Sequence, residues 1–186
     1  MAYTPFDRFV AWRRFRAAAP HIRAGSTVCD LGCGAGAPFL KYIESRLISG
    51  VGLDEHAGVS PRDKISIVSA DITASLPLES AQFDHVTMLA VLEHLTQPIS
   101  VLTEAYRILR PHGTLVLTWP SPAVDPILEI LTHLKLVHQE LGFDQHQPRI
   151  PKNKLKEMLE EIGFVRFQVG IFEMGLNNWL VAHKES

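Results

Sequence analysis

A glycine-rich turn at residues 28–36 constrains the fold of this chain more than any other segment. It reads Val-Cys-Asp-Leu-Gly-Cys-Gly-Ala-Gly, so a β-prone run ends in Asp30 and is followed by glycines at every second position. Glycine adopts positive φ and has no Cβ, so the backbone can turn sharply and a ligand can lie against it. Such a turn between a strand and a helix is typical of a nucleotide site. Asp30 favours a cationic group on that ligand, because a carboxylate would repel a pyrophosphate.

The hydrophobic pattern predicts strands that alternate with helices. A helix is expected near residues 38–47 and another at 98–110, and a Pro-His-Gly turn is expected at 111–113. Only ten residues, 55–64, connect the second strand to the third, which is too short for a full crossover helix. Alternating strands and helices indicate a parallel sheet that is covered on both faces. The predicted strands are 27–31, 48–53, 65–70, 83–89 and 114–119.

The C-terminal part departs from this alternation. A helix is predicted at 151–162, with apolar residues at helical spacing and Gly163 at its end. Two further strands, 165–172 and 178–183, are separated by too few residues for a helical crossover. They should therefore pair as an antiparallel hairpin.

Composition excludes several function classes. The net charge of -2 gives no overall electrostatic case for nucleic acid, and Arg13, Arg14 and Arg16 favour a solvated helix face over a binding patch. No apolar run reaches 18 residues, so no membrane span is expected. Cys29 and Cys33 do not have zinc-ligand spacing and are expected to be reduced. With no secretory signal in the sequence, we expect a cytoplasmic protein.

Three predicted strands end in acids, at Asp30, Asp54 and Asp71. One such acid could be a turn or helix cap, but three in succession beside a glycine turn favour a ligand site. Asp54 lies at the end of the second strand, where an acid can accept both hydroxyl hydrogens of a ribose. Asp71 can accept from an adenine amino group, with Ile72 against the ring. Asp30 and the glycine backbone would hold the cationic end of the ligand.

The sequence resembles the class I, seven-stranded S-adenosylmethionine-dependent methyltransferases, and most closely their small-molecule branch, types 11 and 12. The resemblance runs from about residue 25 to residue 183. The matching segments are VCDLGCGAG, VGLDE, SADI, LPLESAQFDHVTMLAVLEHL and RILRPHGTLVLTWP.

The resemblance implies an α/β fold: a doubly wound, mostly parallel seven-stranded sheet with helices on both faces and the last strand antiparallel. It implies one methyltransferase domain over residues 1–186. Its parts are an N-terminal helix (1–24), a cofactor-binding core (25–119), a lid or acceptor insertion (120–151), and the last helix with the terminal hairpin (152–186).

The resemblance also implies how S-adenosylmethionine is bound. Asp30 and Gly32 would lie near the methionine moiety, and Leu89 and Ala90 beside the methyl-donating sulfur. The ribose would be held at Asp54. The predicted cofactor-binding set is Asp30, Gly32, Cys33, Gly34, Gly36, Asp54, Glu55, Asp71, Ile72, Leu89 and Ala90.

Two histidines are candidate general bases, His94 just after the fourth strand and His146 in the segment before the last helix. The alternative for each is a hydrogen-bonded structural histidine. Some related enzymes carry a metal on a Glu-x-x-Glu-His motif. Here Glu93-His94 is present, but the first position is Ala90, so no metal is expected.

The predicted function is methyl transfer to a small molecule by in-line displacement. The apolar stripe at 127–137 indicates an apolar acceptor, a partner surface, or simple packing on the core. One alternative is a non-catalytic module that binds S-adenosylmethionine. A second is a nicotinamide-dependent oxidoreductase, since Gly32, Gly34 and Ala37 fit a G-x-G-x-x-A variant. The oligomeric state is not indicated.

Overall fold

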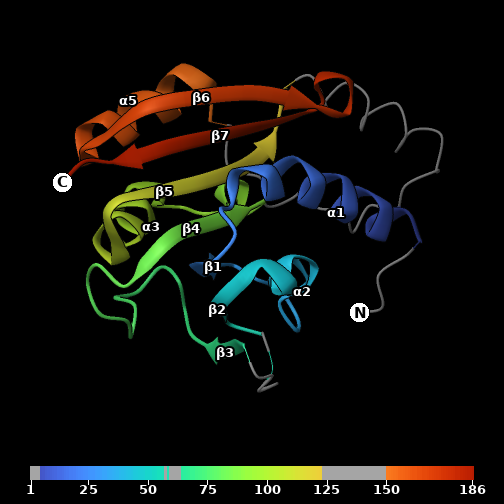
Figure 1. Ribbon diagram of the computed structural model, residues 1–186. Helices are drawn as coiled ribbons and strands as arrows, with labels where there is room; N and C mark the ends of the chain where they lie inside the picture. Colours follow the sequence, from blue (N-terminus) through green and yellow to red (C-terminus); the bar gives the residue numbers. More distant parts are fainter. Residues whose placement is uncertain (1–4, 57, 59–63, 123–149) are drawn as a thin grey trace.

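The computed structural model describes residues 5–56, 58, 64–122 and 150–186 (Figure 1). Its centre is one seven-stranded sheet in the order β3-β2-β1-β4-β5-β7-β6. Neighbouring strands from β3 to β5 pair in parallel, whereas β7 runs antiparallel to both β5 and β6. This confirms the predicted fold class, with the antiparallel last strand. The strands are β1 (Ser26–Leu31), β2 (Leu47–Asp54), β3 (Ile65–Ser69), β4 (Phe83–Leu89), β5 (Leu109–Pro120), β6 (Phe164–Phe172) and β7 (Asn177–Lys184).

Helices cover both faces of the sheet (Figure 1). One face carries α1 (Pro5–Ala18) and α2 (Pro38–Ile43), which are followed by the short 3-10 helices η1 (Ala19–His21) and η2 (Glu44–Arg46). The other face carries α3 (Pro98–Ile108) and α5 (Lys152–Ile162). Two more 3-10 turns are η3 (Leu92–His94) and η6 (Glu173–Gly175). No helix within the described ranges is both long enough and apolar enough to cross a bilayer.

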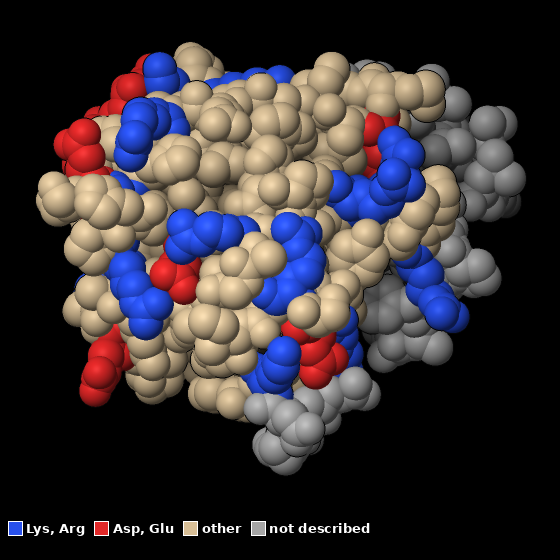
Figure 2. All heavy atoms as spheres, viewed as in Figure 1, with Lys and Arg blue, Asp and Glu red and all other residues tan. Residues whose placement is uncertain are grey.

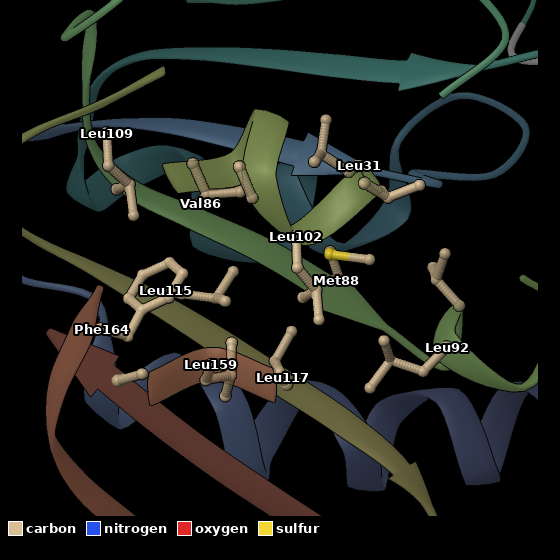
Figure 3. Close-up of a cluster of buried hydrophobic side chains, with 14 of the residues drawn as sticks. Leu31, Val86, Met88, Leu92, Leu102, Leu109, Leu115, Leu117, Leu159 and Phe164 are labelled. Atoms are coloured by element: carbon tan, nitrogen blue, oxygen red, sulfur yellow. The ribbon is translucent and has the colours of Figure 1, made fainter. Parts of the chain in front are cut away.

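The larger core cluster lies between the sheet and the helices α3 and α5 (Figure 3). Leucines of both helices point into it, at helical spacings of three and four residues: Leu102 from α3, and Leu155 and Leu159 from α5. They meet apolar side chains from β4 and β5, including Met88 and Leu117. Burying an apolar stripe of this kind supplies most of the stability of a short helix.

The helix boundaries follow ordinary local signals. Pro98 is the first residue of α3, where its missing N–H would have no helical partner. Gly163 ends α5 in the left-handed conformation, at φ 112°, and donates its N–H to Leu159 O and Glu160 O. The predicted bounds of this helix are confirmed to within one residue.

One local prediction is wrong. Residues 111–113 were expected to form a turn, but they belong to β5, which begins at Leu109. Phe83 pairs with Leu109 and His85 with Thr114, so the extra residues bulge out of the ladder, with His112 at φ 63°. Pairing with the central strand β4 therefore overrides the local turn signal.

The sheet order sets where a ligand can bind. The chain runs outward from β1 to β2 and β3, and then crosses back to β4 on the other side of β1. In an open parallel sheet, such a reversal leaves a crevice beyond the carboxyl ends of the strands. The glycine turn follows β1 at this edge.

Candidate functional site

The glycine turn is held against the end of β2 by backbone hydrogen bonds. Gly32 N–H and Cys33 N–H both donate to Leu53 O, over N···O distances of 2.8 and 3.1 Å. Gly32, Gly34 and Gly36 all have positive φ, between 66° and 73°. A Cβ on Gly32 would also lie only 2.5 Å from Cγ2 of Val91. Both the conformation and the close packing therefore require glycine at position 32.

Asp54, at the end of β2, also holds this turn in place through hydrogen bonds. Its Oδ2 accepts the N–H of Gly34 and its Oδ1 accepts the N–H of His56, each over 2.9 Å. The carboxylate thus joins the glycine turn to the segment that leaves β2. A carboxylate offers about four lone pairs, so it can accept further hydrogen bonds from a ligand.

Asp71 lies two residues beyond the end of β3. Its Oδ1 accepts from both the backbone N–H and the hydroxyl of Thr73, at 2.8 and 2.7 Å. These two hydrogen bonds lower the pKa of Asp71, first the hydroxyl and then the backbone one. Asp71 is therefore ionised at neutral pH and can accept from a ligand donor.

Asp30 differs from the other two acids because it is buried. Only 2% of its surface is exposed, and Thr87 of β4 donates its hydroxyl to Asp30 Oδ1. Burial raises the pKa of Asp30 to about 7; the Thr87 hydrogen bond opposes this shift and the charge of Asp54 adds to it. A cation placed beside this carboxyl would be held most strongly once the proton had left.

A cleft with a volume of about 280 Å³ opens at this edge of the sheet. Seven of the predicted site residues line it, drawn from the ends of β1, β2, β3 and β4: Gly32, Asp54, Glu55, Asp71, Ile72, Ala90 and His94. Four further lining residues were not predicted: His56, Thr73, Val91 and Leu95. Thr73 could have been found, because an Asp followed two residues later by Thr is a common local turn.

Five of the other predicted residues are described by the structure but are not in the lining of the cleft: Asp30, Cys33, Gly34, Gly36 and Leu89. Cys33 is buried behind the turn against Gly52, and burial raises the pKa of its thiol to about 12, so it stays neutral. Leu89 is partly buried in the core below Ala90. Gly34 and Gly36 shape the turn. The histidine at position 146 lies outside the described residues, as does most of the predicted insertion.

The lining indicates which ligands the cleft can take. It combines three carboxylates with apolar side chains and contains no lysine or arginine among the described lining residues. Such a surface suits hydroxyl and amino donors, a flat apolar ring and a cation, and it does not suit a phosphate. His94 adds an imidazole. Partial burial lowers the pKa of His94, and the charge of Arg14 lowers it further, so the ring is neutral near pH 7.

Sequence comparison identifies a family and several similar proteins. The family described as methyltransferase domain matches residues 6–169. The 27-O-demethylrifamycin SV methyltransferase of Amycolatopsis mediterranei is 30% identical over 116 residues, which cover 55% of this chain and 43% of that enzyme. The demethylmenaquinone methyltransferase of Staphylococcus haemolyticus is 24% identical over an alignment of 206 residues, gaps included, which covers 97% of this chain and 85% of that enzyme. Of two other curated relatives, the chain spans 35% and 57% of the length.

Solved structures share the fold. An S-adenosylmethionine-dependent methyltransferase from Thermotoga maritima superposes with a TM-score of 0.72 at 18% identity, over 96% of this chain and 90% of that one. The seven-stranded sheet and its helical layers are thus common to both molecules.

Proposed function

Because this chain belongs to the methyltransferase-domain family, which matches residues 6–169, we propose that it transfers a methyl group from S-adenosylmethionine to a small molecule. The observation that carries this proposal is the cleft itself. It places the carboxylates of Asp54 and Asp71 beside the glycine turn and offers no cationic side chain among its described lining residues. The donor fits that chemistry, because it carries hydroxyls, amino groups and a positive charge but no phosphate.

Each part of the donor has a matching group in the cleft or directly behind it. Asp54 accepts from the ribose hydroxyls, and its two backbone hydrogen bonds hold the carboxylate in place for this. Asp71 accepts from the adenine amino group, and Ile72 lies against the ring. The glycine turn and Asp30 receive the methionine end. The ammonium group there favours the ionised form of Asp30 and lowers the pKa that burial had raised.

When bound, S-adenosylmethionine would supply a methyl group on a positively charged sulfur: the lone pair of an acceptor would bond to the methyl carbon as the carbon–sulfur bond breaks, and the sulfur would leave as the neutral thioether of S-adenosylhomocysteine. The residues of this chain orient the donor and exclude water, and proximity supplies much of the rate enhancement. Leu89 and Ala90, at the end of β4, border the reacting centre. Where the acceptor must lose a proton, His94 accepts it, because its lowered pKa keeps the imidazole neutral. His146 remains a second candidate base.

The acceptor is a small molecule, and we favour an apolar one. The supporting observations are the names of two relatives, which act on demethylmenaquinone and on 27-O-demethylrifamycin SV. The insertion at 120–151 would recognise the acceptor, and residues 25–119 would bind the donor. We place the reaction in the cytoplasm, which suits two buried, free thiols.

Calorimetric titration with S-adenosylmethionine and with NADH tests the donor site. We expect binding of the first alone; binding of NADH alone would support the nicotinamide-dependent oxidoreductase and end this proposal. Transfer of a labelled methyl group to a panel of quinols, macrolactams and polar metabolites then tests catalysis. Donor binding without transfer to any acceptor would favour a non-catalytic binding module.

A further inference from the structure

The outward side of α1 has an unusual composition. Residues 5–18, which form α1, contain four arginines and one acid, although the whole chain has a net charge of -2. Arg8, Phe9, Trp12 and Arg16 are exposed, and their spacing places them together on one side of the helix. We call these four residues the outer face of α1. Phe15, which borders this face, packs on Phe39 and Tyr42 of α2.

Aromatic and cationic groups of the outer face are in mutual contact. The guanidinium of Arg16 lies 5.0 Å from the ring centre of Trp12, and the rings of Phe9 and Trp12 are 6.0 Å apart. The exposed fractions of Phe9 and Trp12 are 56% and 40%. Figure 2 shows Lys and Arg side chains along this part of the surface, with few Asp or Glu beside them. Large exposed apolar groups that are rimmed by charge mark an interaction site.

The outer face lies on a helix that borders the candidate site. Arg14, on the same helix, is close enough to His94 to influence its charge, and His94 lines the cleft. Arg14 is two positions from both Trp12 and Arg16, so it does not share the outer face, and the outer face points to another side of the helix than the cleft.

We propose that the outer face of α1 docks onto an anionic membrane surface. Arginines pair with lipid phosphates, while Trp and Phe settle at the level of the headgroups, where aromatic rings are preferred. Docking would concentrate the protein at a surface that holds lipid-borne acceptors. A nucleic acid fits less well, because the outer face offers two exposed arginines and lies on a convex helix, whereas strand-binding sites are basic grooves. Of the three arginines expected to form a solvated face, Arg13, Arg14 and Arg16, only Arg16 takes another role in this docking.

Vesicle sedimentation of the full-length chain tests the proposal without any need for a methyl acceptor. We expect binding to equimolar phosphatidylglycerol and phosphatidylcholine, and little binding to phosphatidylcholine alone. Each arginine near an anionic surface contributes about fivefold in affinity, so Arg8→Gln with Arg16→Gln should weaken binding about 25-fold. Phe9→Ser with Trp12→Ser should weaken it while leaving the charge unchanged.

A matched control removes the same charge elsewhere. Lys154→Gln with Lys156→Gln takes two exposed cations from α5 and should bind vesicles like the unaltered protein. Calorimetric affinity for S-adenosylmethionine should be the same in all three variants, which shows that each is folded. Equal binding to neutral and anionic vesicles, or an equal loss in the control, would overturn the proposal. Tighter binding to a single-stranded oligonucleotide than to anionic vesicles would overturn it as well.

Discussion

Substitution of Gly32 by alanine gives the sharpest test of how the glycine turn is built. Its φ of +73° costs a residue with a Cβ about 1–2 kcal/mol. The new Cβ would also lie 2.5 Å from Cγ2 and 3.2 Å from Cγ1 of Val91. Over-packing of this kind costs about 1–3 kcal/mol more. Gly25 has nearly the same φ, +71°, with no atom within 4 Å of its Cβ position, so Gly25→Ala isolates the conformational cost.

Urea denaturation of four variants separates the two contributions: Gly25→Ala, Gly32→Ala, Val91→Ala and the double variant at 32 and 91. Val91→Ala removes both atoms that a Cβ at position 32 would meet. The double variant should therefore be more stable than the sum of its single changes predicts, by about 1–3 kcal/mol. Donor affinity should fall in Gly32→Ala and recover in part in the double variant. The reasoning fails if Gly32→Ala costs no more than Gly25→Ala, or if the two changes are additive.

Other predictions concern single side chains. Asp54→Asn can no longer accept both the Gly34 and His56 N–H groups, so the dissociation constant for S-adenosylmethionine, measured by calorimetry, should rise at least about tenfold. For Asp30, the folded-state pKa of about 7 lies above the ordinary 3.8, so stability falls as pH rises from about 4 to 7. Asp30→Asn should remove that fall, which is at most about 4 kcal/mol in urea melts, and also weaken donor binding. Burial lowers the pKa of His85 from 6.5 to about 4, so stability is lost as pH falls through that window. His85→Gln should flatten the acid side of the profile by up to about 3 kcal/mol; an unchanged profile would contradict this. EDTA should leave methyl transfer unaltered, because Ala90 stands at the first position of the Glu-x-x-Glu-His metal motif; a loss of activity would count against this.

Local sequence pattern was sufficient to predict the strand-end acids. Asp30, Asp54 and Asp71 follow apolar runs, and parallel strands bring their carboxyl ends to one edge. Pattern could not show that Asp30 is buried while Asp71 is not. That difference follows from the sheet order: Asp30 lies on β1 between β2 and β4, where Thr87, 57 residues away, reaches it, whereas Asp71 lies beyond the end of the edge strand β3.

The same limit explains the missed lining residues. Val91 and Leu95 belong to the connection after β4, which has no periodic pattern, and only the packing of this connection over Gly32 brings them to the cleft. The turn predicted at 111–113 failed for a related reason, since the pairing of β5 with β4 outweighs the preference of a Pro-His-Gly sequence. The pairing of distant strands therefore determines the local conformation where the propensities of neighbouring residues do not.

The position of β7 has a consequence for the order of folding. Residues 177–184 form an interior strand, between β5 and β6, although they follow every other strand in sequence. During synthesis about 60 further residues must therefore be made before β5 can pair with β7, and until then one edge of the central sheet is unpaired. Contacts between residues that are far apart in the sequence form slowly, and the unpaired edge makes the nascent chain prone to aggregation. A premature stop before residue 177 would thus remove an inner strand. The strands from β3 to β5 would then end in β5 with one edge unpaired, and β6 would have no neighbouring strand.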